Sequence, residues 1–571
     1  LAARERVCDE VAAPAAAVWS DDRRGRLARH FDAAGLAGSW SAVEARIDGF
    51  VERWTAARAE VCRATRVRGE QSESLMKRRD ACLDRALAGI DVRLDAMLTA
   101  DGKALRRAGE LLDGSPVELC TSSEQNSHVD PPDDPERISA LVARVDRLRA
   151  EVELKGAKAI PDLDATLAAL TADAEAARYR PLRAALGVLR GRVAELTGAY
   201  DEAERHYAGA LYQAEVSRDD LAALDAYTHL VQTMTFHLRK LRETRVLLDR
   251  MRATVERVGD DPNLKAKLLR AEALLAAESG EFDQSAALFL RASQEHRKAG
   301  QDVRASTAYG NVGVLYNRKG QPREGVPYLE AAIAELDGRA DASPSARSAP
   351  HINLGRALAL LGESDRALAH LRTAAAIHRE VGEDEPGELL AVLMQGEVLL
   401  ERGDPAAALP LLLRALEFRR KAYGPGASYV ATAALNVARA HVLLGELAAA
   451  EPLLAEAALH VRGDGYEEDS LAAYGHYVRG LFARARGDVR GAREQLERAH
   501  PIVVADGFTD RRLAVGVVLA LADALWSDPP ARPRARALVE ELLPRTRACA
   551  ADGACDPQLP VHLTAWLSGH A

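Results

Sequence analysis

A spacing of about 42 residues between turn positions is the feature that most constrains the fold of this 571-residue chain. Most turns carry a glycine, and in most repeats one small residue precedes the turn by seven positions and another follows it by five. The turn positions are Gly156, Gly198, Lys240, Gly280, Gly320, Gly362, Gly403, Gly445, Gly487 and a position near Pro530. A period of this length, held over about ten units, is typical of a helical solenoid.

Each repeat is predicted to be a helix pair. In residues 414–446, an amphipathic segment ends in Arg419-Arg420-Lys421, Gly424-Pro425-Gly426 interrupts it, and a second helical segment runs to Gly445. Proline and glycine do not continue a helix cheaply, and cations are favourable at a helix C-terminus. Neither helix buries its apolar face alone, so neighbouring repeats must cover it.

The small residues, together with the turn glycines, resemble the pattern of a known repeat. Asn353-Leu354-Gly355, followed by Gly362, Ala367 and Ala374, resembles the tetratricopeptide (TPR) repeat, as does Asn436 with Gly445 and Ala450. The longer unit resembles the repeats of kinesin light chains. The resemblance implies an all-α, right-handed superhelix of helix hairpins, with about ten repeats over residues 137–548.

The remaining segments do not follow the period. Residues 1–126 predict a small helical domain with helices at about 3–18, 21–34, 40–67, 72–98 and 101–112, and with Trp19, Trp40 and Trp54 in its core. Polar residues and three prolines in 121–136 predict a linker, assigned to 127–136. Residues 338–350 predict an exposed loop between repeats, and residues 549–571 a C-terminal cap.

Composition excludes several classes of function. The 76 basic and 85 acidic residues are interleaved and leave a net charge of −9, so nucleic acid is not expected as a partner. No run of about 18 apolar residues occurs, so membrane attachment is expected only through a segment outside this chain. The sequence begins at Leu1 rather than Met, and we expect it to be part of a longer chain.

Six cysteines lie at the two ends of the chain: Cys8, Cys62, Cys82, Cys120, Cys549 and Cys555. No CxxC or CxxH pair occurs, so no metal site is expected. Disulfides, with Cys549 joined to Cys555, would imply an oxidising compartment, whereas buried free thiols are the alternative.

The N-terminal region also resembles a known family. It is similar to the segment that follows the membrane helix in myxobacterial-type serine/threonine protein kinases with C-terminal TPRs. The matching residues are Trp54, Cys62, Ala64-Thr65, Arg68-Gly69-Glu70-Gln71-Ser72, Arg79, Cys82-Leu83-Asp84, Cys120 and Tyr179-Arg180-Pro181-Leu182. The resemblance implies a non-catalytic sensor or scaffold region on the extracytoplasmic side of the bacterial inner membrane, and it favours disulfides over free thiols.

Four N-terminal cysteines permit three pairings. Cys62 and Cys82 lie at unequal distances from a turn near Glu70, which disfavours a bond between them. We predict Cys8 with Cys62 and Cys82 with Cys120.

No catalytic motif is present. The sequence lacks a kinase catalytic loop, a P-loop, a dinucleotide-binding GxGxxG, an HExxH and a GxSxG. We therefore predict no enzyme activity, no cofactor and no bound metal for this chain.

The predicted binding surface is the concave groove built by the first helix of each pair. TPR resemblance implies that an Asn two positions before the small residue contacts bound peptide. The groove residues are Asn311, Asn317, Arg318, Asn353, Arg356, Asn436 and Arg439. Asn amides donate and accept hydrogen bonds, and Arg pairs with carboxylates, so an acidic or C-terminal carboxylate-bearing peptide is favoured. The alternative is that these Asn side chains only bond across adjacent repeats.

The function predicted from these observations is a protein-interaction module that binds a protein or peptide. It acts as the sensor or scaffold region of a transmembrane serine/threonine kinase and is expected to be a monomer. The alternative is a stand-alone cytoplasmic TPR regulator that binds a peptide signal.

Overall fold

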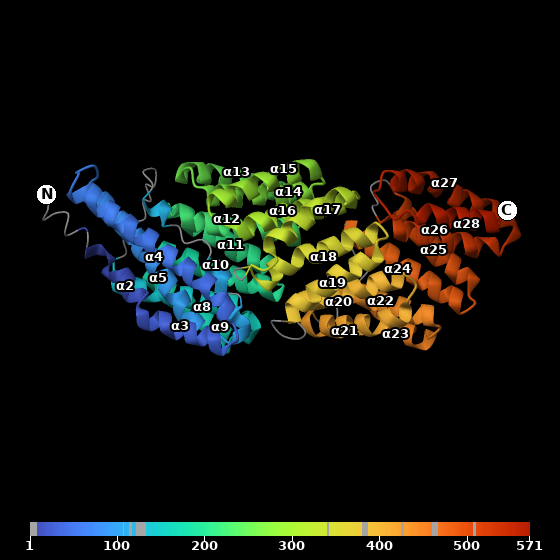
Figure 1. The fold of residues 1–571 in the computed structure, drawn as a ribbon, viewed down its shortest axis with the longest axis horizontal. Coiled ribbons are helices and arrows are strands. Elements are labelled where there is room, and N and C mark those ends of the chain that lie inside the picture. Colours follow the sequence, from blue (N-terminus) through green and yellow to red (C-terminus); the bar gives the residue numbers. More distant parts are fainter. Residues whose placement is uncertain are drawn as a thin grey trace. The chain divides into compact units, whose positions relative to one another are not determined.

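The computed structural model describes residues 8, 10–106, 108–112, 117–121, 133–339, 342–379, 386–423, 428–458, 466–505 and 510–570. Every regular element in these ranges is a helix (Figure 1). The chain forms two compact units. Unit 1 comprises Leu1–Ala308 and Gly338–Ser343, and unit 2 comprises Tyr309–Asp337 and Pro344–Ala571.

The N-terminal helices of unit 1 match the segments predicted at 21–34, 40–67 and 72–98, whereas the segment predicted at 101–112 forms two short helices. Residues 3–7 and 9 of the segment predicted at 3–18 lie outside the described residues. The helices are η1 (Glu10–Ala12), α2 (Ala13–Val18), α3 (Asp21–Ala33), α4 (Ala37–Arg66), α5 (Glu73–Thr99), α6 (Gly102–Leu105), α7 (Ala108–Leu111) and η2 (Glu118–Cys120). Trp54 is fully buried, and its Nε1 donates to the carbonyl oxygen of Leu83 at 2.7 Å. Trp19 is buried and Trp40 packs at the edge of the same cluster, so the predicted tryptophan core is present.

Ten helix pairs follow. In unit 1 they are α8 (Pro135–Lys155) with α9 (Leu163–Ala177), α10 (Arg180–Thr197) with α11 (Tyr200–Val216), α12 (Asp220–Gln232) with α13 (Leu241–Val258), and α14 (Pro262–Glu278) with α15 (Phe282–Lys298). The fifth pair is α16 (Asp302–Lys319), which begins in unit 1, with α17 (Pro322–Leu336) of unit 2.

The other pairs belong to unit 2. They are α18 (Pro344–Leu360) with α19 (Ser364–Arg379), α20 (Pro386–Glu401) with α21 (Pro405–Tyr423), α22 (Ser428–Leu444) with α23 (Leu447–Ala458), α24 (Tyr466–Ala485) with α25 (Val489–Val504), and α26 (Arg511–Trp526) with α27 (Arg532–Ala551). Helix α28 (Leu559–Gly569) closes the chain. The predicted all-α, TPR-like solenoid is confirmed.

The predicted turn positions all fall between the two helices of a pair. Gly362 and Gly445 have φ of 81° and 77°, a left-handed conformation that glycine adopts without a Cβ clash. At the turn near Lys240, which lacks glycine, Arg239 takes the positive φ of 51°, after a π-helical turn (η4, Thr233–His237). The structure therefore explains how Lys240 keeps the period without a glycine.

The small residues before the turn allow the two helices of a pair to approach closely. A Cβ on Gly355 would lie 2.7 Å from Cγ of Leu371, and a Cβ on Gly396 would lie 2.5 Å from Cδ2 of Leu412. Gly191, Gly313 and Gly480 meet Tyr207, Leu329 and Leu496 in the same way. Each partner is sixteen residues later, so the repeated glycine has a packing role.

This packing predicts the sign of two glycine substitutions. Gly355→Ala gains helix propensity of about 1 kcal/mol but forces Leu371 to move, and overpacking costs about 1–3 kcal/mol, so a net loss of stability is expected. Gly209→Ala, in α11 with open space around its Cβ, is expected to stabilise the protein by about 0.5–1 kcal/mol. Denaturant unfolding of both variants measures the difference, and equal effects would contradict the packing role.

Two predicted boundaries need correction or lie outside the described residues. The loop predicted at 338–350 ends at Ser343, because Pro344 occupies the first turn of α18, and Ser348 and Pro350 are buried in that helix. Residues 127–132 of the predicted linker and Gly424-Pro425-Gly426 lie outside the described residues. Helix α8 begins at Pro135, and its Ala150 and Leu154 share a core with the N-terminal helices.

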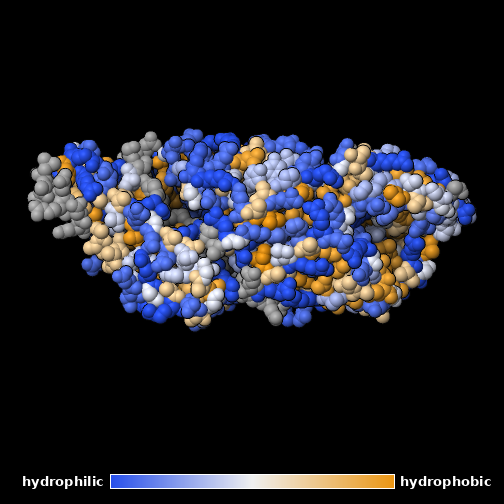
Figure 2. All heavy atoms as spheres, in the orientation of Figure 1, coloured by the Kyte–Doolittle hydropathy of each residue, from blue (hydrophilic) through white to orange (hydrophobic). Residues whose placement is uncertain are grey.

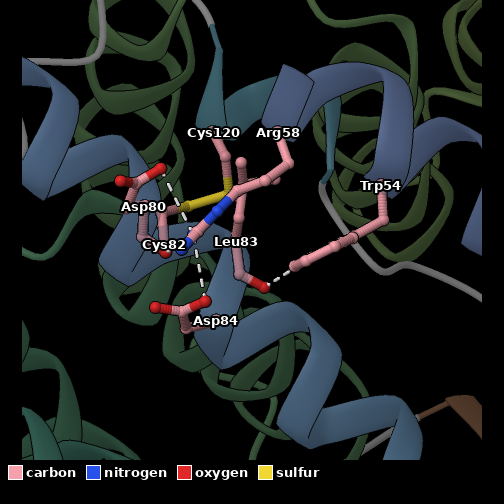
Figure 3. Close-up of a disulfide and its surroundings, with 7 residues drawn as sticks. All are labelled: Trp54, Arg58, Asp80, Cys82, Leu83, Asp84 and Cys120. Atoms are coloured by element: carbon pink, nitrogen blue, oxygen red, sulfur yellow. Dashed lines mark hydrogen bonds and ion pairs between the residues drawn. A yellow bond between two sulfur atoms is a disulfide. The ribbon is translucent and has the colours of Figure 1, made fainter. Parts of the chain in front are cut away.

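Three disulfides are present, in the predicted pairing. Cys8 and Cys62 have Cα atoms 5.6 Å apart, Cys82 and Cys120 are 5.5 Å apart, and Cys549 and Cys555 are 5.6 Å apart. Figure 3 shows Cys82–Cys120 beside the Trp54 hydrogen bond to Leu83. In the same view, Arg58 lies between Asp80 and Asp84, with which it forms ion pairs at 3.3 and 3.0 Å. These contacts join α4, α5 and η2.

The exposed surface is mostly hydrophilic. On the face seen in Figure 2, blue surface predominates, and orange apolar surface gathers over α21 and α23. Helix α23 carries alanine and leucine at most of its positions, and Leu413 of α21 is 44% exposed. Nothing in the described residues covers this apolar surface.

Candidate functional site on the first helices of unit 2

The first helices of the unit 2 pairs lie side by side. Helix α18 contacts α20, α20 contacts α22, α22 contacts α24, and α24 contacts α26. We call the surface that these five helices share the first-helix face of unit 2. In three of the five helices a polar side chain comes one position after the small residue, at Arg356, Glu397 and Arg439.

A hydrogen-bonded chain crosses three of these helices. Asn436 of α22 donates from Nδ2 to Oε1 of Glu397 in α20 at 2.8 Å, and Tyr474 of α24 donates from its hydroxyl to Oδ1 of Asn436 at 2.6 Å. Asn436 is 3% exposed. Its amide is therefore engaged across adjacent repeats, as the alternative to peptide contact predicted, and it holds the Glu397 carboxylate in one orientation.

Arg439 differs from its prediction as an exposed charge. Its side chain is only 13% exposed, its Nη1 donates to Oε1 of Glu401, and its guanidinium lies over the Tyr477 ring at 5.7 Å. Burial is the largest single influence and would lower the pKa of this guanidinium, but Glu401, Tyr474 and Tyr477 together raise it well above its ordinary value. Arg439 is thus a fixed cation neutralised by Glu401, because the neighbouring first helix supplies an acid that single-repeat reasoning did not consider.

Glu397 is the carboxylate without a cationic partner. Among the described residues, its Oε2 receives no hydrogen bond or ion pair. Burial raises the pKa of this carboxyl above its ordinary value of 4.5, against the opposing effects of Asn436 and Arg356. Arg356 itself is exposed and makes no hydrogen bond or ion pair with any residue in the described part.

The other predicted groove residues differ in burial and in hydrogen bonding. Asn317 is buried and donates from Nδ2 to the carbonyl oxygen of Asn353 at 3.1 Å, whereas Asn353 donates to the carbonyl of Ala349 in its own helix at 2.9 Å. Asn311 is partly buried and Arg318 is exposed. Asn311, Asn353 and Asn436, which occupy the same position in their repeats, therefore have different environments.

Sequence reasoning missed Glu397, Glu401, Tyr474 and Tyr477. A signal for them was present, because Glu397 follows Gly396 as Arg356 follows Gly355. Their pairing depends on contacts between repeats, which a template for one repeat does not contain.

Helix α26 also forms a hydrogen bond to α18. Arg512 donates from Nη2 to the carbonyl oxygen of Ala359 in α18 at 2.7 Å and to Oδ2 of Asp556 at 2.9 Å. The adjacent disulfide-closed loop reaches the N-terminal end of α17, where Arg323 donates from Nε to the carbonyl of Gly553 at 2.9 Å. Helices distant in sequence are thereby tied together within unit 2.

Within the described ranges, no helix is both long and apolar enough to cross a membrane.

One comparison with known proteins identifies the repeat. A tetratricopeptide repeat family model matches residues 346–421 and 388–458, which span α18 to α23. The comparison with curated proteins finds no match.

Three solved structures have some similarity to this chain. The Rap protein complexed with competence and sporulation factor is 13% identical over 65% of this chain and 99% of its own, with a TM-score of 0.43. The quorum sensor NprR from B. thuringiensis is 15% identical over 62% and 99%, with a TM-score of 0.42. BtubC (BKLC) from P. vanneervenii is 17% identical over 39% and 90%, with a TM-score of 0.33. The fold assignment depends on the helix pairs and the family model, not on these weak similarities.

Proposed function

We propose that this chain is a protein-interaction module and that the first-helix face of unit 2 binds a peptide segment carrying a cationic group. The proposal is based on the hydrogen bonding of the Glu397 carboxylate. This carboxylate is oriented by Asn436, which Tyr474 holds in turn, yet one of its oxygens has no partner among the described residues. A carboxylate held in this way is ready to accept a charge-assisted hydrogen bond from an ammonium or guanidinium group.

A ligand with a cationic group differs from the acidic peptide that the sequence predicted. The earlier expectation used Arg356 and Arg439 as two free cations, but Glu401 neutralises Arg439. Arg356 remains available for a carboxylate of the same ligand. A peptide with a cation facing Glu397 and an acid facing Arg356 would satisfy both.

We also propose a parent protein and a cellular location for this chain. The N-terminal resemblance supports a sensor or scaffold region of a transmembrane serine/threonine kinase, and the paired cysteines suit an oxidising, extracytoplasmic location. A cytoplasmic regulator that binds a peptide signal is the alternative. Alkylation of cysteines in intact cells, followed by mass spectrometry, distinguishes the two locations. Free thiols at Cys82 and Cys120 would exclude the oxidising location.

Glu397→Gln tests the peptide site. The amide oxygen still accepts from Asn436, but the negative charge is lost. Peptides selected on the purified chain from a random phage library should be rich in Lys or Arg and should bind the variant about tenfold or more weakly. Glu417→Gln, a matched change at an exposed carboxylate on α21, should bind as the wild type does. Selected peptides without basic residues, or equal binding by Glu397→Gln, would contradict the proposal.

The same variant should be more stable than the wild type near pH 7. Because the folded-state pKa of Glu397 is raised, the folded protein binds a proton more readily than the unfolded chain. The charged carboxylate therefore costs stability that grows as pH rises through the folded pKa, and the gain from Glu397→Gln should vanish near pH 4. Glu401→Gln should instead destabilise, since it leaves Arg439 without its partner.

A further inference from the structure

Two partly buried cations in unit 1 form no direct ion pair with any described residue. Lys267 and Arg270 lie three residues apart on α14 and so share one side of that helix. Neither makes a hydrogen bond or ion pair with a residue that the structure describes. Cations in such positions are normally paired, because desolvation without a partner is costly.

Both residues lie on α14, the first helix of its pair, at positions that recur in the other repeats. They precede the turn at Gly280 by 13 and 10 residues, as Tyr474 and Tyr477 precede Gly487. In unit 2 those positions face the preceding first helix, where Tyr474 bonds Asn436. Helix α14 contacts α12 in unit 1, which agrees with this placement.

Nearby acids are already engaged. Asp225 of α12 accepts two hydrogen bonds from Arg149 of α8, at 2.8 and 3.1 Å. The acids of α14 itself pair with arginines in or just before α13. Glu272 pairs with Arg252 at 2.6 Å, and Glu278 pairs with Arg239 at 3.1 Å. The positive charge of Lys267 and Arg270 is therefore not neutralised by a direct partner.

A third cation adds to this charge. Burial is the main cause that lowers the pKa of both Lys267 and Arg270, and the charge of Arg304 on α16 lowers both further. For Lys267 the charge of Asp225, which Arg149 already binds, opposes this lowering. Lys267, Arg270 and Arg304 also all lower the pKa of His296 on α15, whose pKa falls to about 4, mainly through burial. Arg304 thus acts on both Lys267 and Arg270, and all three cations act on His296. We call them the unit 1 cation cluster.

We propose that the unit 1 cation cluster binds a phosphate monoester, as carried by a phosphorylated peptide. Arg offers a planar set of donors that matches phosphate oxygens, and Lys supplies a compact point charge. Two unpaired cations beside a third suit a dianion better than a single carboxylate, and a phosphate monoester carries a charge of about −1.5 to −2 near pH 7. This site lies in unit 1 and does not depend on the peptide site of unit 2.

The test uses the whole chain and a fluorescein-labelled phosphoserine peptide, measured by fluorescence anisotropy. The same peptide with serine and with glutamate distinguishes phosphate from backbone and carboxylate binding, and inorganic phosphate is the competitor. Lys267→Gln/Arg270→Gln should weaken phosphopeptide binding by about tenfold or more, and added salt should weaken it in the wild type. Arg291→Gln is the matched control, an exposed arginine on α15 of the same hairpin.

Each outcome decides the proposal. Binding of the phosphoserine peptide that inorganic phosphate displaces, that the double variant loses and that Arg291→Gln keeps would support it. Glu397→Gln should bind the phosphopeptide normally, so a failure of the unit 2 site would not affect this result. Equal binding of the glutamate peptide, no binding of phosphate, or full binding by a double variant with unchanged circular dichroism would each overturn it.

Discussion

Loss of the N-terminal disulfides is expected to unfold the helices before α8 while the pairs of unit 2 stay folded. The bonds Cys8–Cys62 and Cys82–Cys120 span 54 and 38 residues. Loops of this size predict a stabilisation of about 4 kcal/mol for each bond alone, because the cross-link restricts the unfolded chain. The Cys82→Ala/Cys120→Ala variant also removes the tie between α5 and η2 beside Trp54 (Figure 3).

Hydrogen exchange followed by mass spectrometry measures this loss locally. Peptides from α4 and α5 should lose protection in the variant, and peptides from α20 and α22 should keep it. Cys549→Ala/Cys555→Ala is the control, since its separation of six residues predicts only about 2 kcal/mol and its effect belongs to unit 2. Unchanged protection of α4 and α5 would show that these helices do not depend on the bond.

Arg512→Ala should destabilise unit 2 by about 3 kcal/mol. Arg512 and Asp556 are only 18% and 14% exposed, so removal of the guanidinium leaves a largely buried carboxylate unpaired. The carbonyl of Ala359 also loses its donor. Because this contact joins α26 to α18, protection should fall in both helices although they are more than 150 residues apart in sequence.

Arg420→Ala is the matched control for this change. It removes an arginine from the pair with Glu456 between α21 and α23, where the arginine is 46% exposed. Exposed pairs contribute about 0–1 kcal/mol, so the unfolding midpoint should shift little. Equal losses for the two variants would mean that the return of α26 to α18 adds nothing to the stability of unit 2.

The sequence alone was sufficient for the repeat architecture. Helix ends require a residue that can leave the helix, and close helix packing requires a small side chain, so both appear at a fixed local spacing. Gly355 illustrates this, because its partner Leu371 is in the same repeat. The N-terminal helices were predictable for the same reason, since their caps and apolar faces are local features.

The tertiary structure decided which charges are free. Arg439 and Arg356 occupy the same position in their repeats, yet Glu401 from the preceding first helix neutralises Arg439. The start of α18 was likewise decided by burial of Ser348 and Pro350, although the local residues favoured a loop. Such outcomes depend on which side chain the next helix brings within a few ångströms, and a periodic sequence pattern does not contain that distance.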